Sequence, residues 1–221
     1  MPYSALCMEA PLFTGLIRFL GTLETLQARP FGARLRIKAP AGVLERAEAG
    51  ASICVNGACL TAVARDAHAW ESDLSQETLD RTALGRLAPG ALLHLEPSLR
   101  VGDPLDGHQV SGHVDGVGRL LERPRDEGLW RFSMPAQLAP MTAPKGSVAV
   151  DGISLTVVDC GTEWFTVALI PETVRRTRLE TMACGAEVNL EADPVGRYVA
   201  RALELRLAGD KLQRFARDGW S

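Results

Sequence analysis

Short runs of alternating side chains recur along the chain and indicate β-strands. Residues 33–38 read Ala-Arg-Leu-Arg-Ile-Lys, with a small or apolar side chain at every second position. A period of two is expected of a strand with one buried face. Residues 164–170 form another run, rich in aromatic and aliphatic side chains that favour strands. Residues 52–63 predict two strands around the turn Asn56-Gly57, a pair that strongly favours a hairpin.

The hairpin segment occurs twice in the chain. Residues 52–63 align with residues 147–158 at an offset of 95, with six of twelve positions identical and an Asp-Gly turn in the second copy. The same offset pairs residues 77–84 with 172–179 and residues 90–96 with 185–191, and near the start of each half an offset of 97 pairs Thr14-Gly15 with Ser111-Gly112. One register held over so many positions indicates a duplicated domain. The boundary is expected between about Leu99 and Gly107.

The repeats predict an all-β protein. Each half has several short strands separated by turns that contain glycine and proline, which favours a small closed barrel because closure leaves no exposed edges. After the second repeat, Asp193-Pro194 predicts the start of a helix. An apolar stripe from Val195 through Val199 and Leu203 to Leu207 then follows helical spacing. The stripe could pack on its own barrel or make an oligomer contact, and the tail from Ala208 is polar enough to be loose.

Composition narrows the class of protein. The 221 residues leave room for two domains, and the net charge of −3 without a Lys/Arg-rich stretch argues against a nucleic-acid partner. Residues 1–11 lack the features of a signal peptide, and no apolar run is long enough to span a membrane. Five cysteines without a Cys-x-x-Cys pair argue against a disulfide framework or a structural zinc site. Reduced thiols in the cytoplasm are therefore expected.

Two residues at equivalent repeat positions are candidates for chemistry. Cys59 and Ser154 each precede a Leu-Thr pair directly after the hairpin turn. We expect this arrangement to place thiol and hydroxyl groups at one mouth of each barrel. The alternative is that Cys59 is a small buried hydrophobic residue and Ser154 an ordinary strand residue.

Two histidines lie near the start of the second half. His108 and His113 are five residues apart, which does not place them on one helix face, and no third ligand accompanies them, so we predict no metal site. His113 has Leu16 as its counterpart in the first half. A titratable group present in only one half is what a base serving one of two sites would require. A hydrogen-bonded loop histidine is the alternative.

Glu77-Thr78 and Glu172-Thr173 form a second repeated pair of polar residues. Their carboxylate and hydroxyl groups could hold a polyol chain through hydrogen bonds, or they could cap a helix that begins there. For Asp193, too, the alternative is that it serves only as a helix cap.

Together these motifs resemble the riboflavin synthase family over about residues 12 to 205, in order and with the family's spacing. The segments that carry the resemblance are Leu12-Phe-Thr-Gly15, Val55-Asn-Gly-Ala-Cys-Leu-Thr61, Gln76-Glu-Thr-Leu-Asp-Arg-Thr82, Gly107-His-Gln-Val-Ser-Gly-His-Val-Asp-Gly-Val-Gly118, Lys145, Val150-Asp-Gly-Ile-Ser-Leu-Thr156, Leu169-Ile-Pro-Glu-Thr173 and Val188-Asn-Leu-Glu-Ala-Asp193. Each motif alone is weak, but the ordered set within a duplicated chain is highly specific.

The resemblance implies two tandem six-stranded Greek-key barrels followed by a C-terminal helix that gathers a homotrimer. It implies the domains 1–11 (extension), 12–107 and 108–193 (one lumazine-binding barrel each), 194–208 (helix) and 209–221 (tail). The implied reaction is the dismutation of two 6,7-dimethyl-8-ribityllumazine molecules into riboflavin and 5-amino-6-(D-ribitylamino)uracil, without a cofactor or metal. Association with lumazine synthase, the preceding enzyme of the pathway, stays open.

The resemblance also implies the residues of the site. The reacting atoms are expected near Phe13, Thr14, Cys59 and His113, with Ser154 and Thr156 from the second barrel of a neighbouring subunit. Which of Cys59, Ser154 or water is the nucleophile is left open. The expected substrate-binding residues are Gly15, Leu16, Ile17, Cys59, Leu60, Thr61, Asp73, Leu74, Ser75, Gln76, Glu77, Thr78, Gly112, His113, Val114, Lys145, Ser154, Leu155, Thr156, Ala168, Leu169, Ile170, Pro171, Glu172 and Thr173.

The chain departs from the family at its start. Family members usually begin Met-Phe-Thr-Gly, whereas here Leu12 replaces that methionine and eleven residues precede it. The extension must fold away from the site or partly cover it, and Met8 is an alternative start. The main rival interpretation is a non-catalytic lumazine or flavin carrier of the lumazine protein type. A flavin-dependent reductase is disfavoured because no Gly-x-Gly-x-x-Gly motif follows the barrels.

Overall fold

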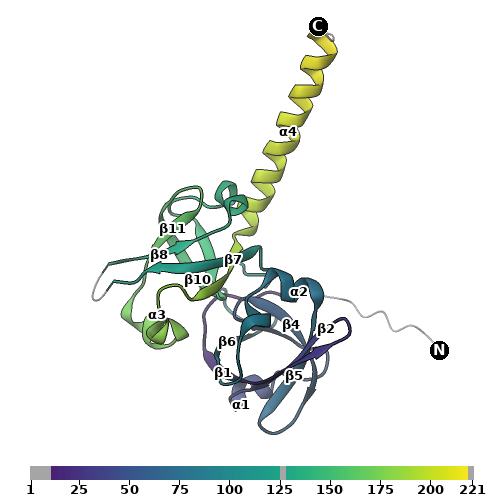
Figure 1. The fold of residues 1–221 in the computed structure, drawn as a ribbon, viewed down its shortest axis with the longest axis vertical. Coiled ribbons are helices and arrows are strands. Elements are labelled where there is room, and N and C mark those ends of the chain that lie inside the picture. Colours follow the sequence, from purple (N-terminus) through teal and green to yellow (C-terminus); the bar gives the residue numbers. More distant parts are fainter. Residues whose placement is uncertain (1–10, 125–127, 219–221) are drawn as a thin grey trace, which may run out of the picture.

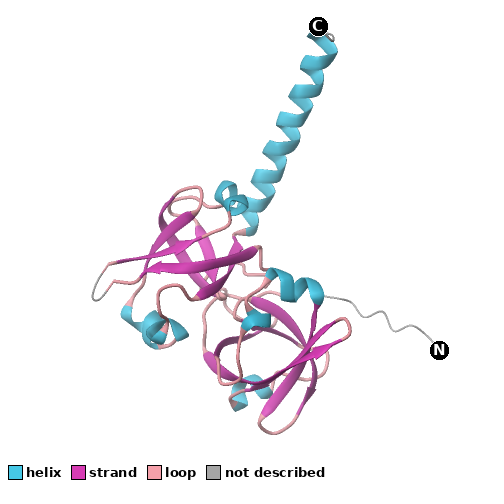
Figure 2. Cartoon of the chain, viewed as in Figure 1, coloured by secondary structure: helices cyan, strands magenta, loops and turns pink. Residues whose placement is uncertain are grey.

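A computed structural model describes residues 11–124 and 128–218. It contains two closed six-stranded antiparallel barrels, drawn in magenta in Figure 2, and few helices. The first barrel comprises β1 (Phe19–Arg29), β2 (Gly32–Lys38), β3 (Ser52–Val55), β4 (Ala58–Arg65), β5 (Ala69–Ser75) and β6 (Leu92–Pro97). The second comprises β7 (Gly116–Glu122), β8 (Leu129–Ser133), β9 (Ser147–Val150), β10 (Ile153–Cys160), β11 (Trp164–Ala168) and β12 (Glu187–Ala192). The prediction of a duplicated all-β protein is confirmed.

The two barrels have the same topology. The strands of the first follow the order β1-β2-β5-β4-β3-β6 around the barrel, and those of the second follow the corresponding order β7-β8-β11-β10-β9-β12. Short helices lie at equivalent places in each half: α1 (Ala41–Leu44), α2 (Gln76–Arg81) and η1 (Leu84–Arg86) in the first, and η2 (Ala136–Met141), α3 (Pro171–Arg175) and η3 (Arg178–Thr181) in the second. The duplication therefore extends to the helices that cover the strand ends.

The hairpin turns form as the sequence predicts. Asn56 and Gly57 have φ values of 44° and 81°, and Asp151 and Gly152 have 47° and 79°. Two successive residues in the left-handed region match the right-handed twist of a tight hairpin, and Asn, Asp and Gly tolerate that conformation best. The run 164–170 is shorter than predicted, because β11 ends at Ala168 and α3 begins at Pro171.

The two turns also meet at the contact between the barrels. A β-carbon placed on Gly57 would lie 2.8 Å from the backbone nitrogen of Gly152, so a side chain would separate the turns. A small cluster of Phe13, Cys54, Val110 and Ala149 lies apart from the two barrel cores, and Phe13 forms a β-bridge with Val110. Close backbone packing therefore joins the two halves.

Two side chains at equivalent positions bond across the interface. His94 Nδ1 lies 2.9 Å from the Asp151 carbonyl, while its Nε2 accepts the Arg178 backbone N–H at 2.9 Å. In the other direction, Asn189 donates to the Asn56 carbonyl at 2.7 Å and its Oδ1 accepts the Ala83 backbone N–H at 2.7 Å. Because Nε2 is an acceptor, the proton of neutral His94 belongs on Nδ1.

The C-terminal helix α4 (Pro194–Asp218) extends away from both barrels (Figure 1). Asp193 caps it by accepting the Val195 N–H at 2.9 Å, and Pro194 is its first residue, as the sequence predicts. The helix was expected to end at residue 208 with a loose tail, but it continues to Asp218. A polar composition, which suggested a loose tail, is also compatible with a helix. Its apolar side chains Val195, Tyr198, Val199, Leu203 and Leu207 are exposed.

Candidate functional site

A cavity of about 310 Å³ lies on the first barrel, between β4, α2 and a segment that precedes the second barrel. It is lined by Ala58, Cys59, Ser75, Glu77, Thr78, Arg81, Thr82, Gly112, His113 and Val114. Seven of these residues belong to the predicted site, although they come from three distant parts of the chain. The structure therefore brings together Cys59, Ser75, Glu77, Thr78, Gly112, His113 and Val114.

The alternation along β4 decides where this cavity lies. Leu60 and Ala62 point into the barrel and are buried, so Cys59 and Thr61 face the outside of the wall. The second barrel repeats this arrangement on β10, where Leu155 is buried and Thr156 is exposed. The expectation that thiol and hydroxyl lie at the mouths of the barrels is wrong, because the period of two places them on the outer surfaces.

Helix α2 supplies the polar side of the cavity. Its cap is Ser75, whose side chain accepts the Thr78 backbone N–H at 3.1 Å and lies 2.9 Å from the Thr78 hydroxyl. Glu77 therefore does not serve as the cap and faces the cavity in the first turn. Gln76 bonds Asp80 along the helix at 2.9 Å, outside the lining of the cavity.

Two predicted binding residues of β5 do not reach the cavity. Asp73 makes two bonds of 2.7 Å to Arg34, and the guanidinium holds the pKa of that carboxyl below its usual range. Leu74 is buried in the core of the first barrel. Both residues were expected at the site because residues 73–78 correspond to a ligand-lining segment of the family that the chain resembles.

Each site is completed by a segment from the opposite half of the chain. Cys59 N–H donates to the Gly112 carbonyl at 2.8 Å, and Ser154 N–H donates to the Gly15 carbonyl at 2.8 Å. Val114 then packs against the first core and Ile17 against the second. The segment before each barrel thus covers the outer wall of the other barrel.

The second-barrel site contains a hydrogen-bonded serine and histidine. Ser154 Oγ lies 2.7 Å from His108 Nδ1. Burial lowers the pKa of His108, with a smaller opposing effect of the Asp193 carboxylate, so the imidazole is neutral at pH 7 and can accept a proton. The catalytic residues predicted from the sequence did not include His108. The signal was available, because the offset of 97 pairs His108 with Pro11 and makes it as asymmetric as His113.

The other residues predicted for the second site fall into two groups. Ile17 and Leu169 pack against the second core at its edge, and Leu155 lies within it. The second group is exposed or half-buried: Leu16, Lys145, Thr156, Ala168, Ile170, Pro171, Glu172 and Thr173. Glu172 forms ion pairs with Arg175 and Arg176, and its pKa is lowered by the Arg175 and Arg176 hydrogen bonds.

Three predicted catalytic residues have constrained environments. Phe13 is fully buried in the cluster between the barrels, and the Thr14 hydroxyl donates to Glu96 at 2.7 Å. Burial raises the pKa of the Cys59 thiol above its ordinary value. A thiol with a raised pKa is mostly protonated at neutral pH and is then a weak nucleophile. His113 is exposed beside Cys59 in the same cavity.

Within residues 11–124 and 128–218, no three His, Cys, Asp or Glu side chains are grouped as metal ligands. The same part of the chain contains no helix that is long and apolar enough to cross a membrane. Its cysteines, Cys54, Cys59, Cys160 and Cys184, are free.

Known sequences match both halves of the chain. The model of the lumazine binding domain family matches twice, over residues 14–98 and 111–193. Riboflavin synthase of Mycobacterium tuberculosis is 43% identical over 199 residues, covering 87% of this chain and 98% of the relative. Riboflavin synthase of Bacillus subtilis is 34% identical over 194 residues, covering 87% of this chain and 90% of the relative.

Solved structures match the fold. A crystal structure of LumP complexed with riboflavin aligns with a TM-score of 0.74 at 22% identity, covering 81% of this chain and 98% of that one. A structure of LumP complexed with 6,7-dimethyl-8-(1'-D-ribityl) lumazine aligns with a TM-score of 0.72 at 21% identity, with the same coverage. At that identity the likeness concerns the fold alone. The double domain match and the identity to riboflavin synthases over most of both chains show that this chain belongs to the riboflavin synthase family.

Proposed function

We propose that the chain is an enzyme that transfers a four-carbon unit between two molecules of 6,7-dimethyl-8-ribityllumazine, a transferase reaction. The products are riboflavin and 5-amino-6-(D-ribitylamino)uracil, and no external oxidant or reductant is needed because the atoms of two identical substrates are redistributed. Family membership supports this proposal, and so does the presence of two related lumazine-binding domains in one duplicated chain.

The observation that carries the proposal furthest is the 2.7 Å contact between Ser154 Oγ and His108 Nδ1. A hydroxyl bonded to a neutral imidazole is an activated nucleophile, because the imidazole takes the proton as the oxygen attacks. We assign Ser154, or a water that it orients, the addition to the ring of the lumazine that gives up its four-carbon unit. The proton passes to His108, and the added group leaves again when the product forms.

The lumazine that accepts the four-carbon unit must lose a proton from its C7 methyl group. His113 is the candidate base at the first-barrel cavity, since it is exposed there beside Cys59. The raised pKa of Cys59 argues against a thiolate nucleophile, so its role in the proposal is to contact the substrate.

Repeated polar residues are the proposed binding groups for the ribityl chain. Glu77 and Thr78 line the first cavity, and Glu172 and Thr173 are their counterparts in the second half. Lys145 is a further binding residue in the proposal. It has a φ of 67°, whereas its counterpart Gly50 has 92°, so a lysine occupies a conformation that favours glycine. Retaining a side chain there is consistent with use of its ammonium group.

The proposal includes a homotrimer in the cytoplasm, with residues 12–107 and 108–193 as the two lumazine-binding units. The exposed apolar side chains of α4 support an oligomer contact because a helix of this kind is stabilised by burial against partners. In that assembly the first barrel of one subunit faces the second barrel of a neighbour. Holding two substrates in the reacting orientation can supply roughly 7–11 kcal/mol. Association with lumazine synthase is tested separately by co-sedimentation.

The test is to incubate the purified chain with 6,7-dimethyl-8-ribityllumazine alone and to follow the absorbance of riboflavin. Steady formation, with one ribitylaminouracil released per riboflavin, supports the proposal. Tight binding without turnover, at protein concentrations where ultracentrifugation shows a trimer, contradicts it and favours a lumazine carrier. Deletion of residues 1–11 in parallel shows whether the extension restricts access to the site.

A further inference from the structure

Two buried carboxylates at equivalent positions are not part of either lumazine site. Glu96 lies in β6 and Glu191 in β12, and they are 6% and 2% exposed. Burying a charge is costly unless donors surround it. Burial raises the pKa of both carboxyls, so each needs strong hydrogen bonds to remain ionised in place.

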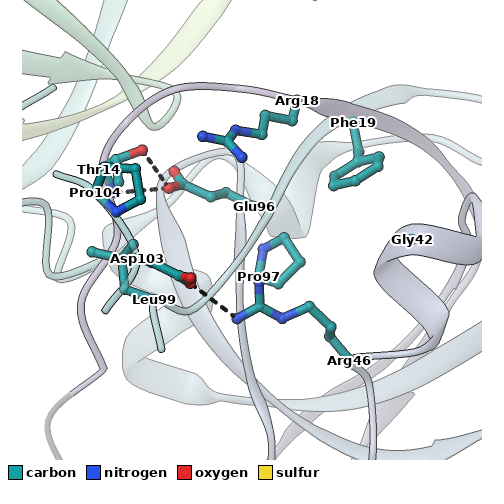
Figure 3. A pocket seen from close by; sticks show the side chains of 10 residues that line it. All are labelled: Thr14, Arg18, Phe19, Gly42, Arg46, Glu96, Pro97, Leu99, Asp103 and Pro104. Atoms are coloured by element: carbon teal, nitrogen blue, oxygen red, sulfur yellow. Dashed lines mark hydrogen bonds and ion pairs between the residues drawn. The ribbon is translucent and has the colours of Figure 1, made fainter. Parts of the chain in front are cut away.

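Each carboxylate has three donors from the same short motif. Glu96 accepts the Thr14 backbone N–H and hydroxyl at 2.7 Å each (Figure 3). It also accepts the Gly15 N–H at 3.0 Å. Glu191 accepts the Ser111 backbone N–H at 2.8 Å, its hydroxyl at 2.6 Å and the Gly112 N–H at 2.9 Å. Hydrogen bonds to an ionised acceptor are stronger than neutral ones, so each motif is firmly held.

The held motif continues directly into the site of the opposite barrel. Gly15 donates to Glu96 of the first barrel, and its carbonyl accepts the N–H of Ser154 in the second. Gly112 donates to Glu191 of the second barrel, and its carbonyl accepts the N–H of Cys59 in the first. Each glycine therefore links a buried carboxylate to the backbone of a site residue 2.8 Å away.

Both glycines are required by this geometry. Gly15 and Gly112 have φ values of 74° and 77°. A β-carbon on Gly15 would lie 2.6 Å from Cβ of Ser154, and one on Gly112 would lie 2.6 Å from Cβ of Cys59. A small rotation of either motif would thus move the contacting site residue, because no space separates them.

We infer that Glu96 and Glu191 are reciprocal positioning residues, each fixing the lumazine site of the opposite barrel. Glu96, in the first barrel, orients the segment Gly15–Ile17 and Ser154 of the second-barrel site. Glu191, in the second barrel, orients the segment Gly112–Val114 and Cys59 of the first-barrel site. Neither carboxylate contacts the substrate. The identity of the ligand in this inference rests on the proposed function. The crossed geometry, in which each carboxylate holds a segment that contacts the opposite barrel, does not depend on it.

Amide hydrogen exchange of the intact chain tests the crossed geometry without any ligand. In Glu96→Gln, the side-chain amide faces one N–H donor and loses that bond, so protection of the Ser154 N–H should fall about tenfold. Protection of the Cys59 N–H in the same variant should stay within about twofold of its value in the wild-type chain. Glu191→Gln should give the opposite result, and the exposed Glu48→Gln is the matched control. Loss of protection within the barrel that carries the substitution, or equal loss in both, overturns the inference.

Ligand affinity provides the second readout. Lumazine labelled with ¹³C in its methyl groups should give two bound signals, which Glu77→Gln and Glu172→Gln assign to the first and second barrels. Glu96→Gln should weaken only the second-barrel signal about tenfold, and Glu191→Gln only the first. Effects on both signals contradict the inference. If the wild-type chain binds no lumazine, the proposed function fails, while the exchange result still decides the positioning roles. Ser111→Ala, which removes one of three bonds to Glu191, should give a smaller effect on the first-barrel signal.

Discussion

The first-barrel site places a protonated thiol, Cys59, beside an exposed histidine, whereas the second-barrel site bonds a hydroxyl, Ser154, to a half-buried histidine. The backbone contacts around the two positions are nearly the same, with an N–H to carbonyl distance of 2.8 Å in each. The two sites thus share a frame and differ in the side chains that could react.

The difference arises in the segments that precede the barrels. His113 lies in the segment covering the first barrel, and its counterpart Leu16 covers the second. His108 reaches Ser154 from the connection between the barrels and has no counterpart histidine in the first half. His108, His113 and Leu16 lie outside the strands and are not among the residues of the barrel cores, so these side chains can change without disturbing the cores. The duplicated strands have the same backbone geometry in both halves, whereas the segments that cross to the opposite barrel carry different side chains.

Of the substitutions that test the difference between the two sites, Ser154→Ala should have the largest effect on the rate of riboflavin formation. If Ser154 and His108 act as nucleophile and base, Ser154→Ala should reduce the rate of riboflavin formation about a thousandfold. Steady-state kinetics measures it, with unchanged thermal stability as a control because the Ser154 N–H bond to Gly15 is retained. A reduction below about threefold, within the range of unrelated surface changes, would remove Ser154 from the mechanism.

The interface pair His94 and Asn189 allows a test through stability. Burial lowers the pKa of His94 to about 4 from 6.5, so the neutral form stabilises the fold. That contribution is complete above pH 6.5 and is lost as the pH falls towards 4, because the unfolded chain binds the proton more tightly. The loss is on the order of 3 kcal/mol.

His94→Asn copies the residue present in the other half and should flatten the dependence of the urea midpoint on pH between 4.5 and 6.5. His68→Asn, at an exposed histidine, is the matched control and should leave the slope unchanged. An equally steep slope in His94→Asn would show that other groups cause the acid sensitivity.

His108→Gln should reduce the rate of riboflavin formation about a hundredfold, since glutamine can hydrogen-bond but cannot take a proton. The pKa of His108 is lowered by burial, so the neutral base persists below pH 6.5. The acid limb of the wild-type rate profile should therefore lie below pH 6.5, and it should be absent in His108→Gln. An unchanged limb in that variant would assign it to another group, with His113→Gln as the comparison.

Cys59→Ser should have the smallest effect on the rate, because it replaces the thiol of the first site by the hydroxyl group that Ser154 provides in the second. With the thiol acting as a contact and not as a thiolate, the rate should change less than about threefold. A loss approaching that of Ser154→Ala would make Cys59 a reacting group and reverse the assignment of roles.

Much of this protein follows from its sequence. The period of two along the strands, the left-handed Asn-Gly and Asp-Gly turns and the offset of 95 predict the duplicated barrels, because strand alternation and turn conformation are local properties. The cap and first residue of α4 are local in the same sense. Its end was mispredicted, because a polar composition alone does not separate a helix from a loose chain.

Only the tertiary structure decided how the halves combine. Alternation along β4 and β10 is visible in the sequence. The site forms on the outer wall only because a segment from the opposite half of the chain covers that wall. The crossing of the Gly15 and Gly112 segments joins residues more than forty positions apart, and Ser154 meets His108 in the same way. Such pairings depend on the packing of two complete barrels, which fixes distances that no local pattern in the chain encodes.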